Sequence, residues 1–494
     1  MERHFKKIFA VTVIVKLILA YFFPITSDEA YFLTWGKNLD INYYDHPPMT
    51  GWIVYLFSFS GKHIFFYRLF PIICGVIVAI AIYLIVRDIF KDEDRARLIA
   101  MAFLVAPLNI LFALISTDTP LFLFVFLAGA FFYYAVNLRR GYLFLVSGIL
   151  LGLAVLSKYF AGLLLIAFGG CLVIRWNRDT IRNGLILLFG AAPFVLLNLY
   201  WNYNSCWSNV MFNIFNRHED VSLELGRFLT FLVFQLYLAT PWLIYYLAKN
   251  MGTVKAGIKR DNNLFFHMYL IPISIIGLIA FHRTGLHWVL SFYPFLFFLL
   301  VYLDKEQILR IVKYSAIFSL IHIATITAIL SLPIETFKKH RKYSDIVMGF
   351  HGDEIYNKLK KYRDRYAFGT TSYATAAIMA YHSGESFFVF GSGSKHGRND
   401  DKVMDFRELD GRNILILKNK KLKERDYRDY FKRIRVETIK VHQASFDIAL
   451  GEGFNYQKYR ELYLTRILQK YYNIPKFLPV GDCFFFNKYF PKRE

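Results

Sequence analysis

The chain has 494 residues, of which 56% are hydrophobic and 19% aromatic, and it carries a formal net charge of +22. With a mean hydropathy of +0.34, it holds more apolar surface than a water-soluble globule can bury, which excludes that class. The composition therefore predicts an integral membrane protein.

Apolar runs of roughly 17 to 25 residues, long enough to cross about 30 Å of hydrocarbon, recur through the first two thirds of the chain. They predict about eleven transmembrane helices, at residues 8–23, 64–86, 98–115, 120–137, 142–156, 159–174, 184–200, 228–248, 264–281, 288–303 and 311–332. About 18 Lys and Arg residues lie in segments on the side of the N-terminus and about 5 in the short loops opposite, so the N-terminus is predicted to be cytoplasmic. An odd number of spans then puts everything after Leu332 outside.

In this topology every loop rich in acids and bases falls on the outer face. These loops hold 28–29, 45–46, 116–118, Lys158, 217–220 and 282–288. Charged groups at the edge of a membrane are costly, so we expect the functional site on this face.

From residue 334 the composition becomes mixed and polar. Short apolar runs at 387–390 and 414–417 predict buried strands, and 371–381 and 456–472 have helical spacing. We therefore divide the chain into a transmembrane catalytic domain, 1–333, and an extracytoplasmic α/β domain, 334–494. The basic stretch 418–435 suits anionic headgroups, phosphorylated lipids or acidic glycans, and it equally suits a solvated surface.

The four cysteines give little indication of function. Cys74 and Cys171 lie inside expected spans, whereas Cys206 and Cys483 fall outside and could pair in an oxidising compartment. Nothing in their spacing requires that bond.

The loop after the first span carries two adjacent acids, Asp28 and Glu29. A carboxylate partly withdrawn from water has a raised pKa and can act as a general base, here on an acceptor hydroxyl or amine. The structural alternative is that Asp28 caps a helix over 29–38.

Other residues of this loop favour a catalytic role for Asp28 and Glu29 over a capping role. Pro47 and Pro48 stiffen the backbone that follows Asp45 and His46. Flat side chains suited to a sugar ring or an isoprenoid tail surround the acids, namely Tyr31, Trp35, Tyr43 and Tyr44.

Four stretches in order carry a family resemblance: SDEAYFLTWGKNLDINYYDHPPMTGWI, APLNILFALISTDTPLFLFVF, GLAVLSKYFAGLLL, and the turn 285–288 followed by Tyr293-Pro294. Together they resemble the C-type (GT-C) membrane glycosyltransferases related to protein O-mannosyltransferases and to lipid A aminoarabinose transferases. The resemblance covers roughly residues 1 to 300 and, more faintly, the tail. It implies a GT-C fold and an inverting, one-step transfer of a sugar from a polyprenyl-phosphate carrier, without a nucleotide.

Carried over by position, the resemblance makes Asp28 the general base, with Glu29 beside it, and puts Asp118 near the donor sugar. Asp45 and His46 match an acid–base pair that is often Glu-Lys in relatives, which leaves phosphate binding by His46 open. In some relatives the acid at the position of Asp45 holds a metal with a later histidine, for which His218 is the nearest match. Because only two such ligands are visible and catalytic zinc sites generally have three, a divalent metal is the less favoured outcome.

The leaving phosphate gains negative charge, so fixed cations on the outer face would stabilise the transition state. The candidates for binding the donor phosphate are Lys158, Arg217, Arg283 and His287, with Tyr44 as a substrate contact. Lys158 is favoured because it sits at a helix junction, although a lysine snorkelling to headgroups fits equally well. Trp288 would stack on the carrier or anchor the interface.

The expected partners are a polyprenyl-phosphate sugar donor, membrane lipids and a glycolipid acceptor such as lipid A, with no nucleic acid. Protein O-glycosylation would use the same base on Ser or Thr. A lipid-linked sugar flippase or secondary transporter is the alternative of another class, because acids lining a membrane cavity also describe it. The Lys-rich composition and the short tail suggest a bacterial protein. With the resemblance and the topology, we expect it in the inner membrane, with the site and the tail on the periplasmic side. The donor sugar stays open among aminoarabinose, galactosamine, mannose, glucose and galacturonate.

Overall fold

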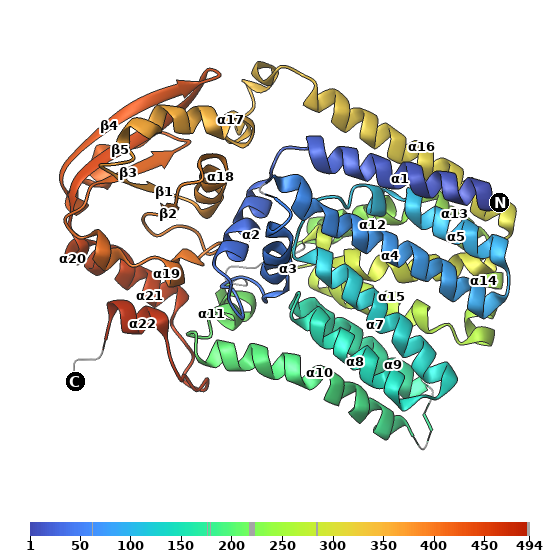
Figure 1. The fold of residues 1–494 in the computed structure, drawn as a ribbon. Coiled ribbons are helices and arrows are strands. Elements are labelled where there is room, and N and C mark those ends of the chain that lie inside the picture. Colours follow the sequence, from blue (N-terminus) through green and yellow to red (C-terminus); the bar gives the residue numbers. More distant parts are fainter. Residues whose placement is uncertain (62, 175, 178, 217–222, 283–284, 492–494) are drawn as a thin grey trace. The chain divides into compact units, whose positions relative to one another are not determined.

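The computed structural model describes residues 1–61, 63–174, 176–177, 179–216, 223–282 and 285–491 (Figure 1). These residues form two compact units. Unit 1 comprises Met1–Phe23, Phe57–Leu197 and Asp220–Leu330, and unit 2 comprises Pro24–Leu56, Asn198–Glu219 and Ser331–Glu494. The expected domain 334–494 is thus only part of unit 2, because two earlier segments pack with it.

Unit 1 is helical. Its helices are α1 (Glu2–Phe22), α4 (Ile64–Phe90), α5 (Glu93–Val105), α6 (Pro107–Ile110), α7 (Asp118–Leu138), α8 (Gly141–Val155), η1 (Tyr159–Ala161), α9 (Gly162–Ile174), most of α10 (Thr180–Tyr203), α12 (Leu225–Ala239), α13 (Pro241–Lys249), α14 (Met251–Asp261), α15 (Leu264–Ile279), η4 (Leu286–Tyr302) and α16 (Lys305–Leu330). Every apolar run identified in the sequence coincides with one or two of these helices.

The number of full-length spans differs from the expected count. Among the described residues, four helices are long and apolar enough to cross a membrane, namely α4, α7, α10 and α16, and up to seven spans result if each of three bent pairs counts as one. The run 228–248 is broken into α12 and α13 with an 86° bend, at Thr240, whose φ is +67°. The run 288–303 forms the 3₁₀ helix η4, which is buried on nearly all sides. About eleven complete spans are therefore not confirmed, whereas a multi-pass membrane protein is.

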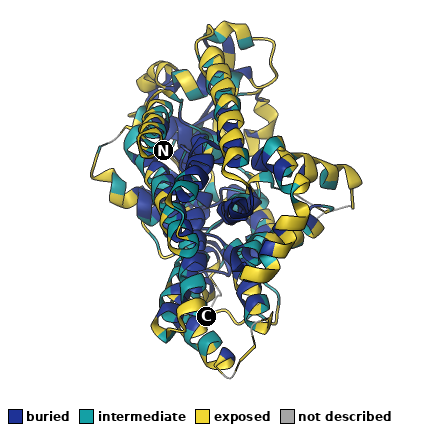
Figure 2. Ribbon diagram, turned by 90° about the vertical axis from the view of Figure 1, so that its right-hand side faces the viewer, coloured by how far each residue is buried: buried dark blue, intermediate teal, exposed yellow. Residues whose placement is uncertain are grey.

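The long helices expose apolar rather than polar side chains on their outward faces. Helix α10 shows this most clearly, with Ile181, Leu185, Leu188, Phe189 and Leu196 exposed. In Figure 2 the buried residues concentrate inside the helical layers, and the exposed ones line the outer sides of helices. Exposed apolar faces of this length are stable in lipid and not in water.

Unit 2 is built on a five-stranded sheet. Its strands are β1 (Ala367–Thr370), β2 (Phe387–Val389), β3 (Ile414–Lys418), β4 (Phe431–Val441) and β5 (Ala444–Phe454), in the spatial order β2-β1-β3-β5-β4. Strand β1 pairs in parallel with β2 and β3, whereas β5 is antiparallel to β3 and β4. The strands expected at 387–390 and 414–417 are therefore present as β2 and β3.

Helices cover both faces of this sheet. On one face α17 (Tyr343–Leu359) packs against β4 and β5, and α18 (Tyr373–Ser383) connects β1 to β2. On the other, Ile414 and Ile416 join an aromatic core with the C-terminal elements, which are α20 (Tyr456–Tyr459), the π-helical turn η10 (Arg460–Leu464), α21 (Thr465–Tyr471) and α22 (Phe484–Tyr489). Short helices complete the tail, namely η5 (Ile334–Phe337), η6 (Lys360–Tyr362), α19 (Asp400–Val403), η7 (Phe406–Leu409), η8 (Glu424–Asp426) and η9 (Arg428–Tyr430). Burial on both sides explains why β3 reads as an unbroken apolar run.

The two earlier segments of unit 2 contain α2 (Ser27–Lys37), most of α3 (Met49–Ser58), the end of α10, α11 (Ser208–Val210) and the π-helical turn η2 (Met211–Phe215). Helix α2 packs against α18. A disulfide joins Cys206 to Cys483, across 277 residues of sequence. The first acidic loop thus belongs to the same compact unit as the sheet.

Candidate active site

Helix α2 is capped by Thr26 and Glu29. The Thr26 hydroxyl oxygen accepts from the backbone N–H of Glu29 at 3.2 Å, and Glu29 Oε2 accepts from the backbone N–H and hydroxyl of Thr26 at 3.1 and 3.0 Å. This reciprocal capping box satisfies donors at the helix start that would otherwise lack partners. The alternative in which Asp28 caps the helix is therefore wrong, and the acid used for capping is the buried Glu29.

Asp28 is left on the exposed side of the same turn. Its Oδ1 accepts a hydrogen bond from the Tyr373 hydroxyl at 3.3 Å, and Tyr373 lies at the start of α18. Crowding by its neighbours removes water from the carboxylate and raises its pKa, and this outweighs the opposing effect of the Tyr373 hydrogen bond. An accessible carboxylate with a raised pKa has the properties of a general base.

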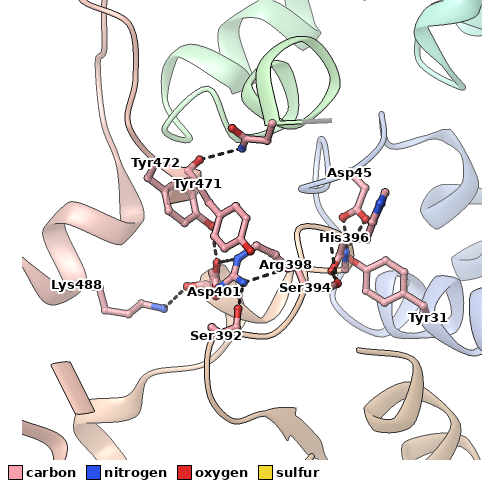
Figure 3. A network of polar contacts seen from close by, with 12 residues as sticks. Tyr31, Asp45, Ser392, Ser394, His396, Arg398, Asp401, Tyr471, Tyr472 and Lys488 are labelled. Carbon is pink, nitrogen blue, oxygen red and sulfur yellow. Dashed lines mark hydrogen bonds and ion pairs between the residues drawn. The ribbon is translucent and has the colours of Figure 1, made fainter. Parts of the chain in front are cut away.

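Asp45 is held rigidly inside unit 2. Its Oδ1 accepts from the Tyr31 hydroxyl at 3.1 Å and its Oδ2 from the backbone N–H of Gly397 at 2.7 Å, while its backbone carbonyl accepts from Asn213 at 2.9 Å. Figure 3 shows Asp45 beside Tyr31 and the loop that carries His396. The carboxylate is buried, so its contacts within the protein fix the orientation of this loop.

The aromatic residues of the first loop mostly pack on one another. Trp35 and Tyr43 stack with ring centroids 4.5 Å apart, and Tyr31 lies 4.9 Å from Tyr373. Tyr44, expected to contact substrate, is buried against Phe212 at 5.5 Å. His46 is half-buried, and its backbone carbonyl accepts from Tyr43 N–H at 3.1 Å. In this structure these rings stabilise the loop that presents Asp28.

A second cluster lies in unit 1. Lys158 Nζ donates to Asp118 Oδ1 at 2.8 Å and to Oδ2 at 3.0 Å, and both side chains are buried. His287 Nε2 lies 3.8 Å from Asp118 Oδ2, with half of its side chain exposed. Asp118 occupies the first turn of α7, where the helix dipole favours a negative charge.

Burial of Lys158 rules out the snorkelling alternative for this structure, because its ammonium group points at a carboxylate rather than into headgroups. Trp288 is also buried, with its ring 4.8 Å from Phe160, so it does not anchor the interface here. Gly285 makes that packing feasible: a Cβ at this position would lie 2.2 Å from Trp288 Nε1. The motif 285–288 therefore positions the exposed His287 next to the buried ion pair.

Three predicted site residues, Arg217, His218 and Arg283, lie outside the described residues. The metal pair of Asp45 and His218 is consequently untested. Among the residues that the structure describes, Asp45 belongs to no group of three or more His, Cys, Asp or Glu side chains close enough to hold an ion.

Sequence reasoning missed the loop 391–398 that follows β2. Arg398 pairs with Asp401 through Nε at 2.7 Å and Nη2 at 2.9 Å and donates to the carbonyl of Ser392 at 2.5 Å, as Figure 3 shows. Tyr472 donates to Asp401 at 2.8 Å. The sequence signal for it is a set of closely spaced glycines and basic residues directly after a predicted strand. This network shapes the loop whose Gly397 N–H binds Asp45.

The sequence is similar to a known family and to a curated protein over part of its length. Residues 45–201 match the sequence family described as dolichyl-phosphate-mannose-protein mannosyltransferase. A lipid A galacturonosyltransferase, RgtD of Rhizobium johnstonii, is 28% identical over 255 residues, which are 50% of this chain and 54% of that protein. The chain thus spans about half the length of the curated relative it matches.

Solved structures extend the likeness to most of the fold. ArnT from Cupriavidus metallidurans superposes with a TM-score of 0.61 in the apo state and 0.62 when bound to undecaprenyl phosphate, at 14% and 13% identity. Each match covers 90% of this chain and 97% of the other. The predicted resemblance to the C-type membrane glycosyltransferases is therefore confirmed, in sequence over residues 45–201 and in fold over most of the chain.

Proposed function

We propose that the protein is an inverting glycosyltransferase that moves a sugar from a polyprenyl-phosphate carrier to a glycolipid of the lipid A type. The reaction takes place on the periplasmic face of a bacterial inner membrane. Asp28 removes the proton from the acceptor hydroxyl, which then attacks the anomeric carbon of the sugar. The carbon–oxygen bond to the carrier breaks, and the carrier phosphate leaves with the electron pair.

The observation that carries this proposal is that the two acids of α2 have different environments. The Glu29 carboxylate accepts hydrogen bonds within the capping box, whereas Asp28 is exposed and has a raised pKa. Asp28 faces solvent, takes no part in capping α2 and is oriented by one tyrosine. A general base that removes a proton from an acceptor needs this kind of accessible carboxylate. Asp118, Lys158 and His287 supply a second set of charges, which we assign to the donor side.

Two relatives support the choice of substrates. The described activity of RgtD is lipid A galacturonosyl transfer, and the second ArnT structure contains undecaprenyl phosphate. A polyprenyl-phosphate sugar as donor and a lipid A-like acceptor are the simplest substrates consistent with both.

The test is mass spectrometry of envelope lipids from cells with and without the protein, with Asp28→Asn as the critical variant. We expect a sugar-sized mass increment that disappears in the null strain and falls at least about 100-fold with Asp28→Asn, which is the lower range for loss of a general base. Asp364→Asn is the matched control, since Asp364 is exposed in unit 2 and distant from α2 in sequence. An unchanged increment in Asp28→Asn would remove the general-base assignment.

The same measurement separates the alternatives. A protein O-glycosyltransferase would leave lipids unchanged and add the increment to envelope proteins. A lipid-linked sugar flippase would alter the sidedness of the carrier lipid without forming a new covalent product. An enzyme is favoured over a flippase because Asp28 and Asp118 each lie in the first turn of a helix rather than in the middle of a long span.

A further inference from the structure

A group of histidines and glutamates in unit 2 plays no part in the proposed transfer. His351 and Glu354 lie on α17, His442 lies in the turn between β4 and β5, and Glu335 lies on η5. Figure 1 shows α17 alongside the β4–β5 hairpin, and the two pack together. Segments about a hundred residues apart in sequence thus bring four potential ligands to one place.

The distances suit a metal ion. His351 Nδ1 lies 2.8 Å and His442 Nε2 lies 3.2 Å from the same oxygen, Glu354 Oε1, and the three ligand atoms are all within 4.8 Å of one another. Bonds of about 2.0–2.1 Å to a tetrahedral zinc ion separate neighbouring ligand atoms by about 3.3 Å. The cluster therefore needs only small side-chain adjustments to enclose an ion.

Glu335 adds an independent indication. Its Oε1 lies 3.0 Å from His442 Nδ1, the ring nitrogen opposite the one that faces Glu354. Metal-binding histidines characteristically donate their other ring N–H to a carboxylate, which fixes the tautomer and the ring orientation. His442 has this arrangement, with one nitrogen toward the ligand cluster and the other toward a carboxylate.

The backbone at both histidines departs from its surroundings. His351 has non-helical angles, φ −128° and ψ 36°, within α17. His442 and Gln443 both have positive φ, at +46° and +62°, in a hairpin turn that glycine or asparagine would occupy with less strain. Histidine tolerates a positive φ better than most residues, so this tight turn can carry the His442 side chain.

We propose that His351, Glu354 and His442 bind a divalent metal ion of the zinc type, with Glu335 orienting His442. Two imidazoles and one carboxylate suit zinc better than calcium or magnesium, which prefer oxygen ligands. The side chains of both histidines are 28–29% exposed, so an ion reaches them from solvent and a water completes its coordination. The ion fastens the β4–β5 hairpin to α17, and through Glu335 to η5. This site is separate from the pair of Asp45 and His218 and does not depend on the transferase activity.

The experiment measures zinc on the full-length protein in detergent, after chelation and dialysis against zinc, by elemental analysis and by competition with a chromophoric chelator. We expect one zinc per chain to be lost in His351→Gln and in His442→Asn, the latter chosen because asparagine tolerates the positive φ of the turn. Glu335→Gln should keep the ion but weaken its affinity by about 10- to 100-fold. Zinc should raise the unfolding temperature of the native protein and of Glu335→Gln, and not that of the two histidine variants.

His340→Ala, at an exposed histidine of the same unit, and His218→Ala are the controls, and both should retain this zinc. Two outcomes overturn the proposal. One is a native protein that retains no stoichiometric zinc, in which case the cluster is only a hydrogen-bonded group of imidazoles and carboxylates. The other is a zinc content lost with His218→Ala and unaffected by His351→Gln and His442→Asn, which would assign the ion to the other pair.

Discussion

At the residue scale, Tyr373 tempers the raised pKa of Asp28. Loss of water around the carboxylate raises that pKa most, the Tyr373 hydroxyl opposes the rise by stabilising the charged form, and the neighbouring Glu29 adds to it. The base works only when deprotonated, so activity should fall as the pH drops through the raised pKa of Asp28.

Tyr373→Phe should therefore move the acid side of the pH–activity profile to higher pH. Removing the hydroxyl takes away the interaction that lowers the Asp28 pKa, so at any given acidic pH a smaller fraction of the base is ionised. The ring contact with Tyr31, at 4.9 Å, should persist in the phenylalanine variant and keep the fold intact. The profile of kcat/KM against pH measures the shift, and a move toward lower pH would contradict the assignment.

The Asp118–Lys158 pair also makes a prediction at this scale. Removing one partner leaves a buried charge alone, which typically costs about 3–5 kcal/mol of stability. Lys158→Met and Asp118→Asn should each lower the free energy of unfolding. The double variant should lose less free energy of unfolding than the two single variants lose together. Thermal unfolding of the native protein, the two single variants and the double variant in detergent measures this double-mutant cycle. Strictly additive losses of stability would show that the two charges do not interact.

The same variants separate stability from function. If the pair serves the donor phosphate, Lys158→Met should raise the apparent KM for the polyprenyl-phosphate sugar more than that for the acceptor. Equal changes in both constants would leave Lys158 with a structural role only.

At the scale of the element, the start of α2 decides what Glu29 does. Glutamine at this position can still accept from Thr26, because the capping box tolerates either residue. Glu29→Gln should accordingly retain most of the activity and stability, whereas Thr26→Ala should lose about 1 kcal/mol. Activity assays and unfolding curves of both variants check this, and a loss in Glu29→Gln as large as that in Asp28→Asn would make Glu29 catalytic.

At the scale of the whole molecule, the disulfide ties the segment 198–219 to the C-terminal tail within unit 2. Such a bond persists in oxidising compartments, as the predicted periplasmic orientation requires. Cys74 and Cys171 are buried and form no disulfide in this structure.

Alkylation of the denatured protein from intact cells should therefore label two cysteines without a reductant and four after reduction. Mass spectrometry of the labelled peptides should assign the protected pair to Cys206 and Cys483. Labelling of all four without reduction would place these residues in a reducing compartment and argue against the predicted orientation.

Much of this arrangement could be read from the chain alone. Each apolar run coincides with a helix, β2 and β3 lie where short apolar runs predicted strands, and the acids of the first loop carry the family resemblance. These features follow from hydrophobicity and local spacing, which act over a few turns of chain.

The sequence by itself thus determined a multi-pass membrane protein and the segment that presents Asp28. Only the tertiary structure decided that Lys158 is buried against Asp118 and that Gly397 holds Asp45. It also decided that His351, Glu354 and His442 meet. Each of these depends on side-chain directions or on contacts between residues distant in sequence, and neither periodicity nor propensity determines such partners.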